Sequence, residues 1–225
     1  MGTILASKII ENAQIVLLDK SGVRWSPAEL LGYLNEGQRA LVGYKSNAYV
    51  VSRSVQLVAG TIQSIPDDAV QLFDIVRNMG ANGGTPGRAI RIAKREMLDA
   101  QVPNWHAATP SAEVRHYLYA EASPRQFMVY PPQPTVSPNY VYMTFGALPP
   151  AVALSEPIRV DDIYEMPLLD FVLYRAWMKD TEFNADGNRS AAHMQAFIAA
   201  LTGKGRNEAG ASPNVTAPAN TVNPQ

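Results

Sequence analysis

The chain has 225 residues, of which 19 are basic and 20 acidic, and it contains no cysteine. The lack of cysteine excludes disulfide bonds, thiolate catalysis and cysteine metal sites. The formal net charge of −1 gives the whole chain no electrostatic attraction for nucleic acid. The apolar run at residues 15–18 is too short to cross a bilayer and no signal-peptide pattern accompanies it, so we expect a protein made in the cytoplasm.

Two amphipathic helices are predicted in the N-terminal part of the chain. The first covers about residues 3–18, with apolar side chains along one stripe. The second covers about residues 27–45 and has a strong start signal. Ser26 can cap the free backbone N–H groups, and Glu29 lies where it completes a capping box. Trp25, just before the cap, is expected to pack on a leucine four positions into the helix.

The pattern becomes strand-like from about residue 50, where apolar and polar residues alternate. Short apolar segments separated by Pro and Gly then predict an antiparallel sandwich or a small barrel. The strand candidates are residues 51–57, 61–65, 73–78, 88–92, 114–119, 126–130 and 140–145. A short helix is expected at residues 93–101, and the glycine-rich stretch 80–87 is typical of a flexible loop.

Helical periodicity returns near residue 162. Residues 163–181 are apolar on nearly all sides, which predicts a buried helix. A final helix is expected from about Asn188, and the chain becomes polar and rich in Ala, Asn and Pro from Gly203 onward. Such a composition cannot bury enough apolar surface to fold alone, so we expect an extended tail.

The predicted fold class is α+β, with an inserted β domain. Two terminal helix pairs cannot bury their apolar faces separately, and we expect them to join as a four-helix bundle. The expected domains are a helical bundle from residues 1–49 and 160–203, an antiparallel β sandwich or barrel-like domain from residues 50–159, and an extended C-terminal tail from residues 204–225.

No motif in the sequence indicates catalysis, a cofactor or a metal site. Gly203-Lys204 lacks the flanking residues of a phosphate-binding loop, and no His-Glu-x-x-His is present. The histidines lie in three different predicted elements: His106, His116 and His193. The acidic residues near residue 162 are those expected at a helix N-terminus. We therefore expect no enzyme, no cofactor and no metal, and assign no catalytic residue.

Several short stretches of the sequence form a recognisable series. The first is the helix start Trp25-Ser26 with Glu29-Leu30, followed by Leu34-Asn35-Glu36 and Gln38-Arg39. The others are, in chain order, residues 57–66, 74–79, 105–106, 113–117, 129–132, 169–176, 179–180 and 193–197. Together they cover residues 5–201 and resemble bacteriophage head-to-tail adaptor (connector) proteins of the podovirus tail-tubular type.

This resemblance implies a structural role in the neck of a virion. Adaptors of this kind form a ring, here expected to be a dodecamer, that stacks beneath the portal and offers a docking surface to the tail nozzle. The expected partners are other copies of the chain, the portal protein, the tail nozzle or tail tubular protein, and genomic DNA passing through the bore. No membrane partner is expected. A near-neutral charge suits a conduit, because many phosphate contacts would hold DNA in place.

Two groups of residues are candidates for the contacts of such a ring. The nearly all-apolar helix has a second face to bury against a neighbouring subunit, and its candidate subunit-interface residues are Asp170, Arg175, Trp177 and Lys179. For Asp170, a partner from another helix or from another subunit is expected. The tail is expected to wrap into portal clefts, and its candidate portal-binding residues are Gly205, Pro213, Asn214, Pro218, Asn220 and Pro224.

Two alternative functions remain open at this point. One is a tail completion or tail-tube protein, in which the β domain is the main assembly surface and rings are commonly six-fold. The other is an enzyme or a sugar-binding β module on a helical stalk. Ring symmetry distinguishes the first alternative from an adaptor, and turnover or sugar binding by a monomer would favour the second.

Overall fold

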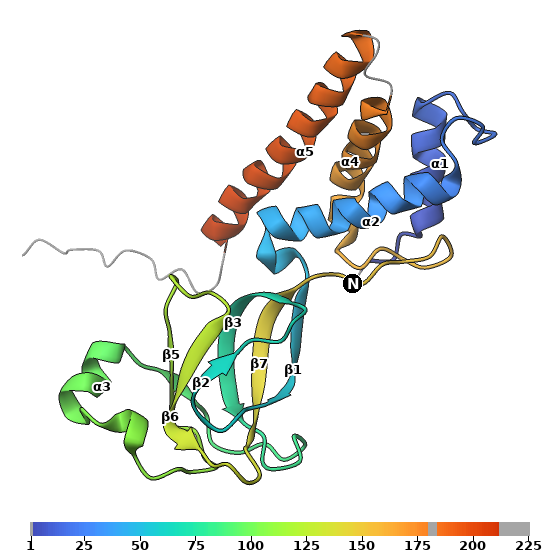
Figure 1. Cartoon of the computed structure of the whole chain (residues 1–225). Coiled ribbons are helices and arrows are strands. Elements are labelled where there is room, and N and C mark those ends of the chain that lie inside the picture. The colour runs from blue at the N-terminus through green and yellow to red at the C-terminus, as the bar shows by residue number, and fades with distance from the viewer. Residues whose placement is uncertain (1, 180–183, 212–225) are drawn as a thin grey trace, which may run out of the picture. The chain divides into compact units, whose positions relative to one another are not determined.

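The computed structural model describes residues 2–179 and 184–211 of the chain. Within these ranges it contains five α-helices and two β-sheets, which confirms the predicted α+β class (Figure 1). The chain divides into two compact units. The helical unit comprises residues 1–45 and 150–225, and the β unit comprises residues 46–149.

Helix α4 is the common packing partner in the helical unit. The helices of this unit are α1 (Ala6–Val16), α2 (Pro27–Tyr44), α4 (Glu165–Met178) and α5 (Asn184–Ala211). Helices α1, α2 and α5 each pack against α4. The side chains at these contacts include fully buried Ile9 of α1, Leu34 of α2, Val172 of α4 and Phe197 of α5. A regular four-helix bundle stays a prediction.

The start of α2 is capped as predicted, but only half of the capping box forms. The Ser26 hydroxyl accepts a hydrogen bond from the Glu29 N–H at 3.2 Å. The Glu29 carboxylate, expected to return to the backbone of Ser26, accepts instead from the Tyr33 hydroxyl at 2.8 Å and from Lys179 Nζ at 2.9 Å. A cation on α4 is a stronger partner for this carboxylate than a neutral N–H.

Trp25 connects the start of α2 to α4. Its indole Nε1 donates to the Ala176 carbonyl at 3.2 Å, and its ring lies edge-on to Trp177 with the centroids 5.8 Å apart. The side chain is buried. The sequence predicted a contact within α2, whereas the hydrogen-bonded partner is the end of a helix that follows about 150 residues later.

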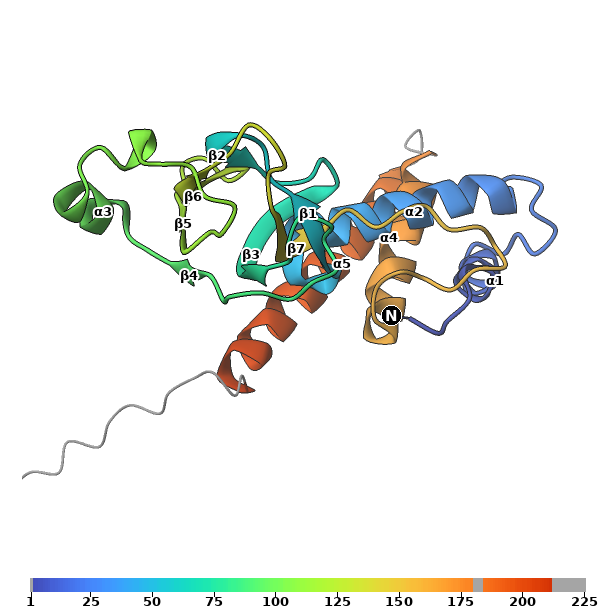
Figure 2. The ribbon, with the colours of Figure 1, turned by 90° about the horizontal axis from the view of Figure 1, so that it is seen from below.

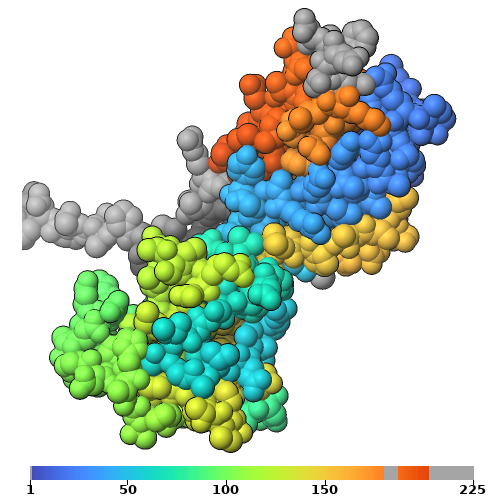
Figure 3. Space-filling view, in the orientation of Figure 1, coloured from blue at the N-terminus to red at the C-terminus, as the bar shows by residue number. Residues whose placement is uncertain are grey.

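The segment after the β unit belongs to the helical unit. The Asn35 side chain of α2 forms two hydrogen bonds with the backbone of Val152, at 3.1 and 2.9 Å. Buried Gln38 accepts from the Arg159 N–H at 2.7 Å. Residues 150–159, expected within the β domain, therefore line the helices, and the gold surface beside the blue helices in Figure 3 marks this segment.

The β unit contains a three-stranded and a four-stranded sheet. The strands are β1 (Val50–Gln56), β2 (Gly60–Ser64), β3 (Ala69–Asn78), β4 (Arg91–Ile92), β5 (His116–Tyr119), β6 (Gln126–Gln133) and β7 (Tyr140–Ala147). The strand orders are β1-β7-β3 and β2-β6-β5-β4. All seven strands lie within or overlap the predicted strand segments, although the predicted strand 88–92 is reduced to the two residues of β4.

One strand pair departs from the predicted antiparallel pattern. Strands β4 and β5 are parallel, with Arg91 opposite His116 and Ile92 opposite Tyr117. The chain between them forms α3 (Arg95–Gln101) and a short 3-10 helix. A parallel pair requires such a crossover connection, and the helix predicted within this segment is what makes the parallel pairing feasible.

Both sheets contribute side chains to one hydrophobic core. Its members are Leu57, Ile65, Ala69, Leu72, Ile75, Ile90, Val114, Tyr117, Phe127, Val129, Val141, Met143, Phe145 and Ala147. A second, smaller cluster joins Leu98 and Trp105 to Leu118 of β5. Helix α3 lies beside β5 and β6 on the side away from β3 and β7, so this cluster is on the outer face of the four-stranded sheet (Figures 1 and 2).

The final helix is longer than the sequence predicts. Helix α5 continues to Ala211, so residues 204–211, assigned to the extended tail, are helical. Residues 204–211 contain no proline and include Lys, Arg, Glu and Ala, which favour helices. The proline-rich part of the predicted tail, residues 212–225, lies outside the described residues.

A substitution pair in α2 tests the close approach of α2 and α4. A Cβ atom at Gly37 would lie 2.9 Å from Cδ1 and 3.4 Å from Cβ of buried Phe171, whereas a Cβ at Gly32 meets nothing within 4 Å. We expect Gly37→Ala to lower the free energy of unfolding by about 1 kcal/mol, because overpacking outweighs the gain in helix propensity. Gly32→Ala should raise it by about 0.5–1 kcal/mol. Urea titrations of both variants measure this difference, and equal effects would contradict it.

Candidate interaction surfaces

Asp170 of α4 has its partner on α5. The Oδ1 atom of Asp170 lies 2.9 Å from Nδ1 of His193, and both side chains are largely buried. One turn away, the Ser190 hydroxyl donates to the Tyr174 carbonyl at 3.1 Å. The sequence left open whether the partner of Asp170 lies on another helix of the same chain or on another subunit, and the structure places His193 of helix α5 next to it.

Arg175 of α4 and Lys179, the residue that directly follows α4, contact α2. The Nε atom of Arg175 lies 3.2 Å from the Glu36 carboxylate, and its guanidinium lies 5.3 Å from the centre of the Tyr33 ring. Lys179 bridges the Glu29 carboxylate, at 2.9 Å, and the Arg24 carbonyl, at 3.1 Å. These contacts join the basic side chains at the C-terminal end of α4 to the acidic side chains Glu29 and Glu36 of α2.

Trp177 packs between two neighbours in the same unit. One is Trp25, and the other is Arg189 of α5, whose guanidinium lies 5.0 Å from the centre of the Trp177 ring. All four residues predicted for a subunit interface therefore have partners within the helical unit. Their role between subunits stays a prediction.

The contacts between α2 and α4 shift two pKa values. Hydrogen bonding to Lys179 lowers the pKa of Glu29 below its usual 4.5, with a smaller contribution from the Tyr33 hydroxyl. Burial raises the pKa of Tyr33 to about 12, and the bond to Glu29 adds to this effect. At neutral pH, Tyr33 is therefore a neutral donor to a charged carboxylate.

The α1–α2 loop presents apolar side chains on a rigid backbone. The Asp19 carboxylate accepts hydrogen bonds from the backbone N–H groups of Val23, Arg24 and Trp25 at 2.8–3.0 Å. These bonds, led by that from Trp25, hold the pKa of Asp19 below its usual value. The side chains of Leu18 and Val23 are 92% and 87% exposed. Sequence analysis missed this surface, since an exposed leucine at a helix end carries no signal of its own.

Leu18 has an unusual backbone conformation. Its φ angle is +56°, in the left-handed region that bulky residues rarely adopt. A fully exposed leucine in this conformation gains nothing from burial within the chain. Together with Val23, Leu18 forms a small exposed apolar group on this loop.

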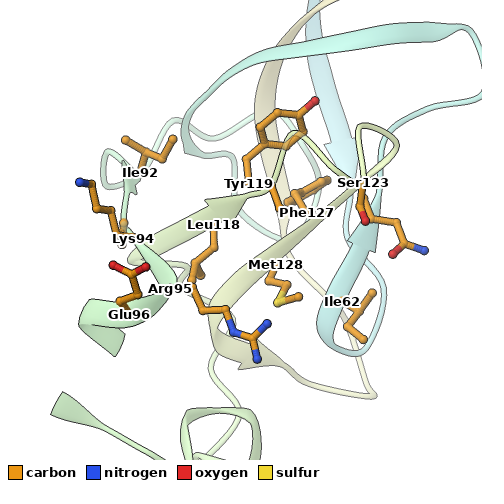
Figure 4. A pocket seen from close by; sticks show the side chains of 13 residues that line it. Ile62, Ile92, Lys94, Arg95, Glu96, Leu118, Tyr119, Ser123, Phe127 and Met128 are labelled. Carbon is orange, nitrogen blue, oxygen red and sulfur yellow. The ribbon is translucent and has the colours of Figure 1, made fainter. Parts of the chain in front are cut away.

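A second surface is a groove along the four-stranded sheet, which includes part of its outer face. We call it the sheet-face groove and define it by Ile62, Ile92, Leu118, Tyr119, Phe127 and Met128, with Lys94, Arg95 and Glu96 at one rim (Figure 4). Its volume is about 810 Å³. Most of the side chains that line it are apolar.

A third surface lies next to this groove and is basic. We call it the arginine edge: a pocket of about 380 Å³ lined by Arg88, Ala89, Arg91, Arg115 and His116. Arg88 pairs with Glu113 at 3.3 Å. Sequence analysis missed this surface too, although four cations among residues 88–95 were a visible signal.

The described residues show no grouping typical of a metal site or a membrane span. Among them, no three His, Asp or Glu side chains are arranged to hold a metal ion. No helix in the described ranges is both long and apolar enough to cross a bilayer. Of the predicted portal-binding residues, Gly205 lies in α5, and the other five, Pro213, Asn214, Pro218, Asn220 and Pro224, lie outside the described residues.

Comparison with protein-family models gives a match over most of the chain. The family model described as SU10 adaptor protein matches residues 5–220. No curated protein matches the chain. The matched range includes both units and all three surfaces described above.

Replacing Lys179 by methionine tests the ion pair between α2 and α4. Because Glu29 has a lowered pKa in the folded state, the stability that it contributes is complete above about pH 4.5 and is lost as pH falls through the folded-state value. We expect Lys179→Met to lower the free energy of unfolding by about 0.5 kcal/mol at neutral pH, since the pair is partly exposed.

The loss should shrink in urea titrations at a pH below the lowered folded-state pKa of Glu29, where its carboxyl is protonated in both proteins. Lys20→Met, at an exposed lysine of the α1–α2 loop, serves as the control. An equal loss at both pH values would mean that packing of the lysine stem, and not the ion pair, is what matters.

Proposed function

Because the chain belongs to the SU10 adaptor protein family, we propose that it is the head-to-tail adaptor of a tailed bacteriophage of the podovirus type. Family membership itself makes the chain a phage adaptor, a structural component of the virion that contacts other head or tail proteins. The proposal goes further. It is that the chain forms a dodecameric ring between the portal and the tail nozzle, and that genomic DNA passes through this ring.

The exposed apolar side chains of the helical unit support a ring. Neighbours in a ring contact each other through two different faces, so each subunit must offer two surfaces. Leu18 and Val23 lie on the α1–α2 loop, and Ile163 and Met166 are 58% and 63% exposed at the start of α4. The proposed interface includes the exposed edges of Asp170, Arg175, Trp177 and Lys179, whose intramolecular partners keep them in place.

The C-terminal residues suit an extended contact with the portal. Residues 212–225 contain no charged side chain and include three prolines. Fully extended, these residues would reach about 46 Å, at about 3.3 Å per residue. A polar segment of this kind binds by folding onto its partner. We assign the portal contact to Gly205, Pro213, Asn214, Pro218, Asn220 and Pro224.

The charge of the chain supports a conduit for DNA. With a formal net charge of −1, a ring of copies offers few phosphate contacts overall. Each phosphate contact strengthens DNA binding by releasing counterions, so a surface with few of them lets DNA slide.

The central experiment mixes the purified chain with the portal protein of the same phage. Single-particle microscopy should show a twelve-fold ring of the chain on the portal. A chain that ends at Ala211 should lose at least about tenfold in portal affinity, which corresponds to about 1.4 kcal/mol. A chain with residues 212–225 in scrambled order controls for their length and composition.

Other outcomes would contradict the proposal in distinct ways. A six-fold ring that the chain forms alone would favour a tail completion or tail-tube protein. No association with the portal at all would contradict the adaptor role. Unchanged portal affinity after truncation would contradict only the role of the C-terminal residues.

The α1–α2 loop provides a separate test of the ring interface. We expect the double substitution Leu18→Asp and Val23→Asp to prevent ring formation on the portal, because charged groups would have to be buried between subunits. The free energy of unfolding of the free chain should not fall, since both side chains are exposed. Lys20→Asp, at an exposed residue of the same loop, is the matched control, and rings that form equally well with all three chains would place the interface elsewhere.

A further inference from the structure

The sheet-face groove is built on a row of aligned apolar residues. Strand pairing places Ile62 of β2 opposite Met128 of β6, and Met128 opposite Leu118 of β5. Residues that are directly opposite on paired strands point to the same face. Figure 4 shows Leu118, Met128 and Ile62 in this row. The row runs across three strands on the outer face of the sheet.

This face is only partly covered by the chain itself. The segment of α3 and the following 3-10 helix packs Leu98 and Trp105 against Leu118. Beyond this cover, Ile62 of the row is 55% exposed. Ile92 of the edge strand β4 also lines the groove and is 65% exposed, but it is paired with Tyr117 and therefore lies on the other face of the sheet. An exposed group of apolar side chains with a charged rim is typical of a surface that binds another molecule.

The arginine edge carries positive charge that the chain does not neutralise. Arg88 pairs with Glu113, whereas Arg91 and Arg115 have no carboxylate within ion-pair distance in the described part of the chain. The pocket also contains the buried Nδ1 atom of His116, which has no hydrogen-bond partner there. Two neighbouring unpaired guanidinium groups are suited to bind carboxylates or other oxyanions.

The two surfaces meet at strand β4. Arg91 lines the arginine edge and is paired with His116, which lies on the same face of β5 as Leu118 of the groove, two residues later. Strand β4 is the last strand of its sheet, so nothing in the strand order separates the two surfaces. One ligand can therefore cover the apolar groove and reach the guanidinium groups at the same time.

The combination of surfaces favours a protein segment as the ligand. A nucleic-acid backbone would pair with the arginines but would leave the apolar groove in contact with water. A second copy of this chain is a poor candidate through its C-terminal residues, because residues 212–225 contain no acidic side chain. The ligand that satisfies both surfaces combines apolar side chains with neighbouring carboxylates.

We propose that the sheet-face groove and the arginine edge together form the docking surface for the tail nozzle protein. The nozzle protein contributes a segment whose apolar side chains fill the groove and whose carboxylates pair with Arg91 and Arg115. This inference rests on the proposed adaptor function, from which the identity of the partner comes.

The test measures binding between the purified full-length chain and the nozzle protein of the same phage by calorimetry. Two double variants each remove one surface: Arg91→Glu with Arg115→Glu, and Ile62→Asp with Ile92→Asp. We expect each to lower the nozzle affinity by at least about tenfold. Raising the salt concentration should weaken binding of the wild-type chain more than that of the arginine variant, because salt screens the ion pairs.

Matched substitutions elsewhere provide the controls. Arg39→Glu changes an exposed arginine of α2, and Val136→Asp changes a side chain of the β unit that is 79% exposed. Both should bind the nozzle protein like the wild-type chain. Urea titrations of every variant verify that it is folded.

The outcomes separate this inference from the proposed function. If the chain forms a twelve-fold ring on the portal but both double variants bind the nozzle protein normally, the docking surface is wrong and the adaptor role stands. If no ring forms, the adaptor role fails, while the binding of chain to nozzle still tests the docking surface directly. If the arginine variant loses binding to a short DNA duplex and keeps its affinity for the nozzle protein, the arginine edge is a nucleic-acid surface and the inference is overturned.

Discussion

The packing of three helices against α4 is the constraint on which the helical unit depends. Helix α4 is buried on most sides because α1, α2 and α5 all use it to cover their apolar faces. The approach of α2 is so close that a Cβ atom at residue 37 would crowd the ring of Phe171. The indole of Trp25 and the carboxylate of Glu29 then bond to the end of α4. Loss of α4 would leave three amphipathic helices without a partner.

The charged side chains of α4 and those of the arginine edge differ in their partners. In the helical unit, the ionic side chains of α4 are paired with α2 and α5, so they stabilise the monomer. In the β unit, Arg91 and Arg115 remain without a carboxylate partner among the described residues. Charged groups that are already paired within the chain contribute little to binding a partner. Unpaired cations next to an apolar groove can form ion pairs with the partner, and the groove can bury the partner's apolar side chains. This contrast is why we place the docking of a tail protein on the β unit.

The parallel pair of β4 and β5 creates this docking surface. The crossover through α3 that joins these strands covers one part of the outer face and leaves the part near Ile62 exposed. The same pairing sets Arg91 next to His116 and so assembles the arginine edge. The sequence predicted an antiparallel sandwich or a small barrel, in which neighbouring strands need no crossover of this kind.

The sequence by itself determined the local structure of this protein. The helix start at Ser26, the strand segments of the β unit and the short helix α3 all follow from side-chain periodicity and caps, which depend on residues close together in the chain. Only the tertiary structure decided the partner of Asp170 on α5, the bond from Trp25 to α4 and the parallel pairing of β4. Each of these joins residues that lie far apart in the chain or joins strands through a long crossover. Local patterns carry no information on such contacts, because which surfaces meet is settled by how the folded elements pack.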